Sequence, residues 1–88
     1  MGRVEAFDSP KSVVCRFHSN DHLPPHFHVR TQDGRLHFRV AFLEPVNRMV
    51  TVIVGEPRAK LIHEITALAA ANRVSLLKEW EEKVSHEN

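Results

Sequence analysis

The chain has 88 residues, of which 42% are hydrophobic and 26% are charged; this composition excludes a disordered tail and leaves room for one domain with one modest core. Its formal net charge is +1 with neutral histidines, so the overall charge does not demand a nucleic acid or an anionic membrane as partner. A single cysteine excludes an intrachain disulfide and a cysteine-based zinc site, and no apolar stretch approaches the length of a membrane span. We therefore expect a cytoplasmic protein of bacterial type, without a signal peptide and without a membrane partner.

The chain is predicted to begin with a loose leader over residues 1–11, or a short edge segment at best, and residues 12–88 to form one domain. From residue 12 to residue 18, apolar and polar residues alternate as in a half-buried strand. One face of that strand carries Val13, Cys15 and Phe17, and the other carries Val14, Arg16 and His18. Residues 19–25 are predicted to form a loop, stiffened by two prolines that fix φ and lack an N–H donor.

The Asp33-Gly34 pair is a strong signal for a two-residue hairpin turn. Folding the chain there places every apolar residue opposite an apolar one and every basic residue opposite a basic one, which a slip of one residue would scramble. The sequence therefore predicts paired strands at about 26–32 and 35–42. The inner face of this hairpin is Phe27, Val29, Leu36, Phe38, Val40 and Phe42, and its outer face is His26, His28, Arg30, His37 and Arg39.

After a turn at 44–48, the continuous β-branched run 49–54 predicts a central or well-covered strand, which Gly55 ends. A helix follows over about 57–71, with an apolar face of Leu61, Ile62, Ile65, Leu68 and Ala69. A second helix over about 73–85 has an apolar stripe of Val74, Leu77, Trp80 and Val84. Strands before helices predict an α+β domain, with a three- or four-stranded antiparallel sheet and two C-terminal helices packed on one of its faces.

Five of the seven histidines lie between residues 18 and 37, and clustered imidazoles are typical of metal binding, proton transfer or anion binding. One hypothesis is a transition-metal site for zinc, iron, manganese or nickel. In that hypothesis His26 and His28 project from the same side of one strand. His22 reaches back from the loop, and Asp21 supplies an oxygen ligand.

A second hypothesis uses the same histidines without a cofactor. Arginine binds phosphate as a fork of donors and histidine moves protons, so His26 or His28 would act as acid or base in phosphodiester cleavage. The residues expected to bind an anion or a partner are Arg30, His37 and Arg39, with Arg16 and His18 from the neighbouring strand. Like charges opposite one another on a sheet cost stability, which favours a negative ligand on this face.

Each feature also has a purely structural interpretation. A neutral histidine beside a Pro-Pro turn is held by backbone carbonyls without any ligand, and Cys15 on an inward strand face is a small buried hydrophobe. Trp80 is interpreted as core or interface. The charged side chains Glu79, Glu81, Glu82 and Lys83 are interpreted as a solvated helix face, with a favourable i,i+4 pair between Glu79 and Lys83.

The run Asp21-His22-Leu23-Pro24-Pro25-His26-Phe27-His28-Val29 resembles the signature of a family of small uncharacterised bacterial proteins, a domain of unknown function. The ending Leu76-Leu77-Lys78-Glu79-Trp80 is also similar to that family, and the resemblance covers residues 12–82. The family usually has a Gly-rich hairpin and a short connection to the helices, whereas this chain has a longer third-strand region at 44–55. The resemblance implies a member of a two-gene cassette similar to toxin–antitoxin modules.

The leading expectation is a toxin–antitoxin-like component that binds RNA or a cognate small protein through its His/Arg face, with phosphodiester cleavage as a further activity. One alternative is the metal-binding protein or metal-dependent enzyme described above. Another is a protein-interaction module whose exposed sheet edge or helix stripe pairs with another chain or with a second copy of itself.

Overall fold

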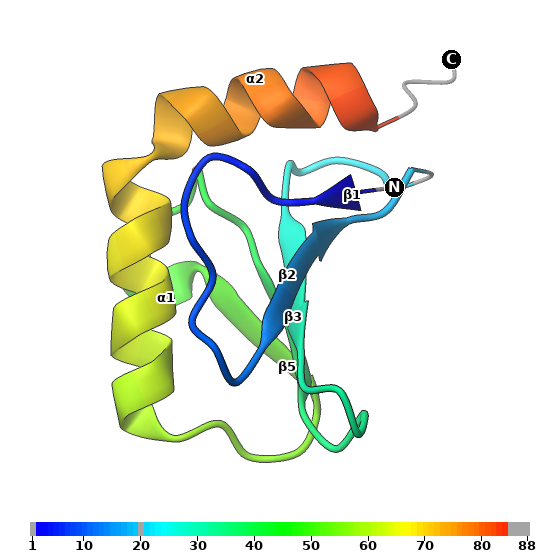
Figure 1. Ribbon diagram of the computed structural model, residues 1–88. Coiled ribbons are helices and arrows are strands. Elements are labelled where there is room, and N and C mark those ends of the chain that lie inside the picture. Colours follow the sequence, from blue (N-terminus) through cyan, green and yellow to red (C-terminus); the bar gives the residue numbers. More distant parts are fainter. Residues whose placement is uncertain (1, 20, 85–88) are drawn as a thin grey trace.

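The computed structural model describes residues 2–19 and 21–84, and its strands precede its helices (Figure 1). The strands are β1 (Gly2–Arg3), β2 (Val14–Phe17), β3 (Phe27–Arg30), β4 (His37–Val40) and β5 (Val50–Val54). A 3-10 turn, η1 (Val46–Arg48), precedes β5, and the helices are α1 (Ala59–Ala71) and α2 (Arg73–Lys83). Within the described ranges, neither helix has the length and apolar character that crossing a membrane requires. The predicted α+β class is confirmed.

The sheet has five strands in the order β1-β2-β3-β4-β5, and every neighbouring pair is antiparallel. The predicted sheet of three or four strands is therefore too small, because the sheet has one strand more than the larger of those numbers. The additional strand is β1, which pairs with β2 through Gly2 opposite Phe17 and Arg3 opposite Arg16. Val4, directly after β1, is buried. The described part of the first eleven residues thus contains a two-residue edge strand, and the remainder up to residue 11 forms no further strand or helix.

The β3–β4 hairpin has the predicted register: Phe27 is opposite Val40, His28 opposite Arg39, Val29 opposite Phe38 and Arg30 opposite His37. Its strands are shorter than predicted because the turn is wider. The Asp33 carboxylate organises that turn, accepting hydrogen bonds from the Thr31 hydroxyl at 2.7 Å and the Arg35 amide at 3.0 Å. Gly34 adopts φ +75°, as the Asp-Gly signal requires.

Strand β5 is an edge of the sheet, not the central or well-covered strand that its β-branched run predicts. Val52, Ile53 and Val54 are each about half exposed. The register slips between His37 and Phe38, which face Val54 and Val52, so Ile53 is an extra residue in a β-bulge. A continuous apolar run is typical of a strand covered on both faces, but in this chain it lies at an open edge.

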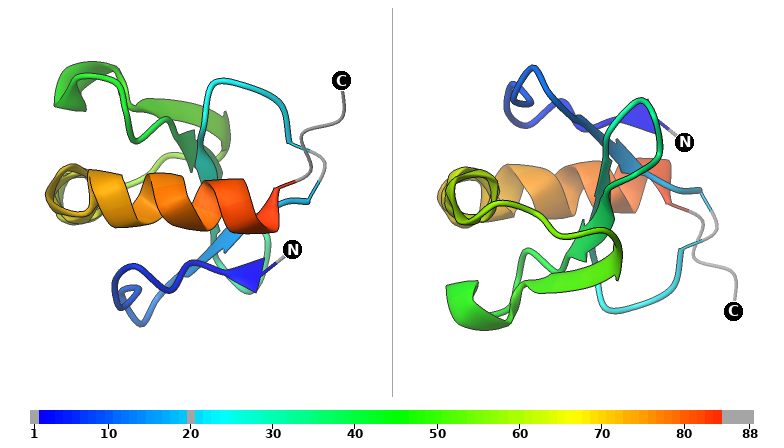
Figure 2. Two further views of the ribbon diagram at one scale, coloured as in Figure 1. Left: turned by 90° about the horizontal axis from the view of Figure 1, so that it is seen from above. Right: turned by 90° about the horizontal axis from the view of Figure 1, so that it is seen from below.

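The apolar core lies between one face of the sheet and the two helices, which are arranged crosswise (Figures 1 and 2). Phe17 packs at its centre, with ring centroids 6.4 Å from Phe27 and Phe42 and 6.3 Å from Trp80. The predicted inward residues of β2 and the hairpin are buried in this core; Leu36 is partly buried against it. Burial raises the pKa of the Cys15 thiol, in keeping with its interpretation as an inert core residue.

Helix α1 contributes buried Ile65 and Ala69 to the core, as predicted. The stripe predicted for α2 is wrong in part: Val74 is 85% exposed, and Leu76 is buried instead. The buried face of α2 follows the i,i+4 series Leu76, Trp80 and Val84. Val74 lies two residues before Leu76, which places it on the other side of the helix. The predicted last residue of α2, Ser85, lies outside the described residues.

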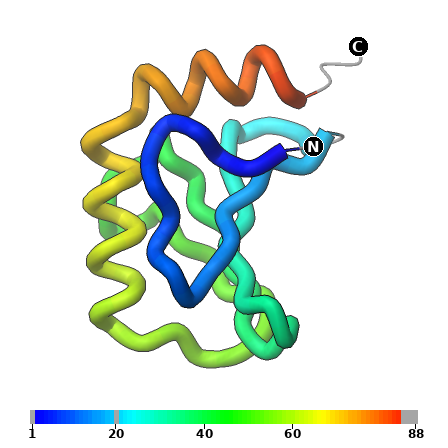
Figure 3. The backbone as a smooth tube through the Cα atoms, viewed as in Figure 1, coloured from blue at the N-terminus to red at the C-terminus, as the bar shows by residue number. Residues whose placement is uncertain are grey.

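The Glu79 side chain is buried rather than part of a solvated face. Its carboxylate accepts hydrogen bonds from the backbone amides of Glu5 at 2.7 Å and Ala6 at 2.9 Å. The Lys83 ammonium donates to the same carboxylate at 2.7 Å, which confirms the predicted i,i+4 pair, and to the carbonyl of Arg3 at 3.0 Å. These bonds attach the N-terminal segment to α2, and Figure 3 shows that segment running along α2 before it turns back into β2.

Candidate functional site

The candidate site lies on the sheet face opposite the core and on the loop between β2 and β3. Strand β3 supplies His28, β4 supplies His37, and the loop supplies Asp21. The His28 Nε2 atom lies 3.1 Å from Asp21 Oδ2, and the His28 Nδ1 atom lies 3.0 Å from His37 Nε2. One imidazole thus joins a carboxylate on one side to a second imidazole on the other.

The charge state of His28 follows from these contacts. Burial, and after it the neighbouring His18, lower the pKa of His28 to about 4. A neutral imidazole has one donor and one acceptor nitrogen. Because the Asp21 carboxylate accepts, His28 donates through Nε2, and its Nδ1 accepts from Nε2–H of His37. Burial and Arg30 likewise lower the pKa of His37, in keeping with a neutral pair.

His26 approaches the same carboxylate from the loop end of β3. Its Nδ1 atom lies 2.8 Å from the carbonyl oxygen of Pro24, which can only accept, so Nδ1 carries the proton. Its Nε2 atom lies 3.3 Å from Asp21 Oδ2, and its side chain is 5% exposed. Two imidazoles therefore converge on one oxygen of Asp21. Sequence spacing predicted both histidines, and the Pro-Pro loop supplies the carbonyl that orients one of them.

The structure adds His18 to the cluster and leaves His22 apart from it. The His18 ring stacks on the ring of His28, with centroids 3.8 Å apart and planes 7° from parallel. Ligand atoms of His18, Asp21 and His28 all lie within 4.8 Å of one another. His22, which the sequence places in the metal set, is exposed. This group differs from the predicted ligand set: His18 enters it, and among the described residues neither His22 nor His26 meets the same mutual distance.

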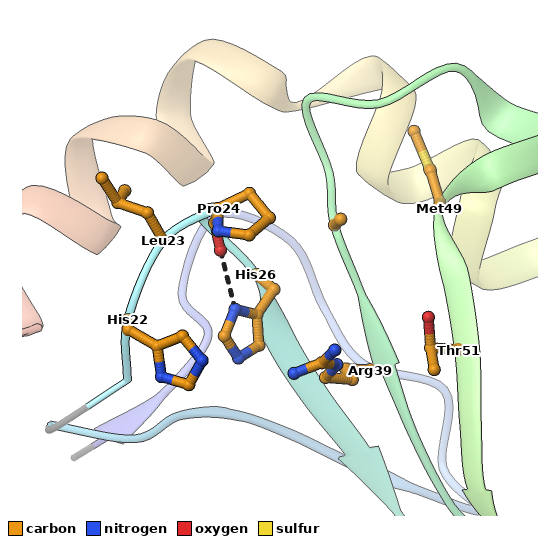
Figure 4. Close-up of a pocket in the computed structure, with 8 residues that line it drawn as sticks. His22, Leu23, Pro24, His26, Arg39, Met49 and Thr51 are labelled. Atoms are coloured by element: carbon orange, nitrogen blue, oxygen red, sulfur yellow. Dashed lines mark hydrogen bonds between the residues drawn. The ribbon is translucent and has the colours of Figure 1, made fainter.

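A pocket of about 150 Å³ opens on the other side of His26. Figure 4 shows His22, His26 and Arg39 directed toward a common space below Pro24. The pocket is small, which suits an inorganic ion or one phosphate group better than a larger organic ligand. Because His22 and Arg39 both line this pocket, His22 is grouped with a basic residue and not with the Asp21 carboxylate.

A row of basic residues crosses the sheet on this outer face. Arg3 is opposite Arg16, Arg16 is opposite His28, and His28 is opposite Arg39. In the described part of the chain, none of the three arginines forms an ion pair with a carboxylate. We call Arg3, Arg16, His28 and Arg39 the basic row. Arg30 and His37 are opposite one another in the next row, also as predicted.

Sequence reasoning missed Arg3, because a two-residue strand leaves no pattern of alternation to detect. The only available signal is the Gly-Arg-Val triplet ahead of the loop, whose apolar Val4 packs into the core. Arg16, His28 and Arg39 follow from alternation in β2 and from the hairpin register.

A family model described as Domain of unknown function (DUF4160) matches residues 13–81. The chain belongs to the DUF4160 family. The match confirms the resemblance to an uncharacterised family, and it spans β2 through most of α2, so it includes every residue of the cluster and leaves Arg3 outside. No curated protein and no solved structure matches the chain. The DUF4160 assignment carries no chemistry, so function is argued from the site itself.

Proposed function

We propose that this protein binds RNA through the basic row on its outer sheet face, as a cytoplasmic component of a toxin–antitoxin-like pair. The observation that supports the proposal is the direct cross-strand alignment of Arg3, Arg16, His28 and Arg39. Neutral His28 adds no charge to the row, but the guanidiniums of Arg3 and Arg16 are directly opposite one another and repel, and that repulsion is relieved when an anion binds across them. The row spans three inter-strand gaps, about 14 Å, long enough to contact more than one phosphate.

Arginine suits this role because its guanidinium presents a planar fork of donors to phosphate oxygens. Arg16 is exposed and Arg39 is partly exposed, so both guanidiniums are accessible to a ligand. The pocket that Arg39 shares with His22 and His26 offers a further place for one phosphate group. Binding here depends on the nucleic-acid backbone, so weak sequence preference is expected.

Phosphodiester cleavage is the second part of the proposal, with His28 as base. Asp21 fixes the tautomer of His28, as the carboxylate does in catalytic triads. The nitrogen directed away from Asp21 is Nδ1, which accepts from His37, so His37 has to turn aside before Nδ1 reaches a substrate hydroxyl. A pKa of about 4 makes His28 a weak base at neutral pH. The site therefore supports RNA binding better than it supports phosphodiester cleavage.

The test is fluorescence anisotropy with a labelled single-stranded RNA at low salt, where phosphate contacts are strongest. Arg16→Gln and Arg39→Gln should each weaken binding by about 10-fold, and the double variant should weaken it by about 100-fold. Each should lower the slope of log affinity against log salt by about 1.

The matched control is Arg58→Gln, an exposed arginine just ahead of α1 and off the basic row. It should leave affinity and salt slope unchanged. Equal loss in the control, or no RNA binding by the wild type at low salt, overturns the proposal. Degradation of the RNA by wild type but not by His28→Gln would support the cleavage part.

A second candidate function is protein binding at the edge strand β5. The supporting observation is that Val52, Ile53 and Val54 are about half exposed beside an unpaired strand edge. Such an edge is a template for strand addition. If a second copy pairs there, sedimentation velocity should show a dimer that Ile53→Lys converts to monomer with RNA affinity unchanged. If the wild type is monomeric at all concentrations, the hypothesis that β5 pairs with a second copy is wrong.

A further inference from the structure

We propose that Asp21, His26 and His28 bind one divalent transition-metal ion, of which zinc fits the donor set best, with His18 as the fourth ligand. The proposed site shares His28 with the basic row, but metal binding is argued and tested without RNA. Its starting point is the contact between Asp21 Oδ2 and His26 Nε2, at 3.3 Å. His26 already donates its Nδ1 proton to the Pro24 carbonyl, so neutral His26 directs a lone pair at a carboxylate oxygen. Two acceptors at this distance, one buried and one only 15% exposed, repel unless a positive charge lies between them.

The two distances from Asp21 to the histidines match those between ligands of a tetrahedral ion. Two donor atoms, each about 2.0–2.1 Å from one tetrahedral zinc, lie about 3.3 Å apart. Asp21 Oδ2 lies 3.3 Å from His26 Nε2 and 3.1 Å from His28 Nε2. The rings of His26 and His28 are inclined by 67°, so their lone pairs are not parallel and can converge.

The outer hydrogen bonds match those of metal-bound histidines. Such histidines donate their second ring N–H to a carbonyl or another acceptor, which fixes the ring orientation. His26 does so through Nδ1 to Pro24 at 2.8 Å. For His28, the same role falls to Nδ1 and His37 Nε2, 3.0 Å apart. With Nε2 on the ion, the proton of His28 lies on Nδ1, and His37 carries its own proton on Nδ1 so that its Nε2 accepts. Both second partners are thus already in place.

His18 is assigned as the fourth ligand because it lies close to Asp21 and His28. A nitrogen of His18 lies within 4.8 Å of the ligand atoms of Asp21 and His28. His18 is partly exposed at the end of β2, so its ring has room to rotate out of the stack and complete the set. Imidazole and carboxylate ligands suit zinc, while Cys15, on the core side of the sheet, is excluded as a ligand.

Charge makes Asp21 the decisive ligand. Arg16 and Arg39 flank His28 on either side in the basic row and oppose a cation there. Asp21 is the only carboxylate that contacts the cluster among the residues the structure describes. Removing its charge therefore has a larger effect than removing one neutral imidazole.

The experiment uses the full chain, purified without a histidine tag and stripped with chelator. Cobalt(II) serves as the optical probe, and zinc is measured by competition against it. We expect one equivalent of cobalt with the visible absorption of a tetrahedral site. Asp21→Asn and His28→Gln should weaken binding by more than about 100-fold, beyond what loss of an outer partner costs.

The controls are His22→Gln, from the loop, and His63→Gln, from the exposed side of α1; both should bind metal as the wild type does. His18→Gln, on a partly exposed side chain, separates loss of a ligand from loss of the fold, and circular dichroism checks each variant. If the wild type binds no metal, the charge between Asp21 and His26 is a proton and the proposal is wrong. It is also wrong if Asp21→Asn binds normally. Neither result alters the RNA assay.

Discussion

Gly55→Ala is expected to destabilise the protein by about 2–4 kcal/mol. Gly55 ends β5 with φ +84°, a left-handed conformation that costs an alanine about 1–2 kcal/mol. An added Cβ would also lie far inside van der Waals contact with the carbonyl oxygen of Arg35, and 3.3 Å from the Cα of Leu36. Because both neighbours are backbone atoms of the turn that leads directly into β4, the strain is relieved only by moving that backbone and the β4–β5 ladder that follows it. Urea denaturation followed by circular dichroism measures the change.

The control is Gly34→Ala at the tip of the β3–β4 hairpin. Gly34 has φ +75°, close to that of Gly55, but nothing lies within 4 Å of the position that an added Cβ would occupy. The Gly34→Ala variant should therefore lose only the stability that the left-handed backbone conformation costs an alanine, about 1–2 kcal/mol. Equal losses in the two variants would show that the close approach to Arg35 contributes nothing.

The hairpin could be predicted in detail because its information is local. Asp33-Gly34 specifies the turn, and alternation on both sides specifies which residues share a face. The four register pairs follow from those two facts alone. The outer positions of His28, Arg30, His37 and Arg39 follow with them, so local sequence signals are sufficient to place these members of the candidate site on one face.

The edges of the sheet could not be predicted in the same way. The β5 run 50–54 has the composition of a covered strand, but whether another strand pairs beyond it depends on the whole topology. β1 is only two residues long, and it is held by distant contacts with β2 and α2 rather than by its own pattern. Arg3, and with it the length of the basic row, was therefore missed.

The chemistry of the cluster depends on distances that spacing does not encode. The sequence placed Asp21, His26 and His28 together, but it placed His22 beside them as a metal ligand and His18 on the neighbouring strand among the anion-binding residues. The loop instead directs His22 to the pocket beside Arg39, while β2 pairing brings His18 onto the ring of His28. The tautomers of His26 and His28 follow only from the atoms that face their nitrogens.

Glu79→Gln is expected to destabilise the protein by about 2–3 kcal/mol, although helix periodicity places Glu79 on a solvated face. Its carboxylate accepts from the amides of Glu5 and Ala6, and hydrogen bonds to a charged group contribute about 1.5–3 kcal/mol each. A glutamine retains one acceptor oxygen, but its NH₂ group then faces the second amide, donor against donor. Thermal and urea unfolding measure the loss.

A second measurement distinguishes the loss of hydrogen bonds to the Glu79 carboxylate from a simple loss of packing around it. The hydrogen bond from Lys83 to Glu79 raises the pKa of Lys83, so Glu79→Gln should return that pKa toward its ordinary value. NMR titration of the Lys83 side chain measures this shift. The control is Glu81→Gln, which removes an exposed carboxylate from the same helix and should change stability by less than about 0.5 kcal/mol. If both variants unfold alike, the buried carboxylate does not anchor the N-terminal segment, and β1 is held by its pairing with β2 and by the hydrogen bond from Lys83 to the Arg3 carbonyl.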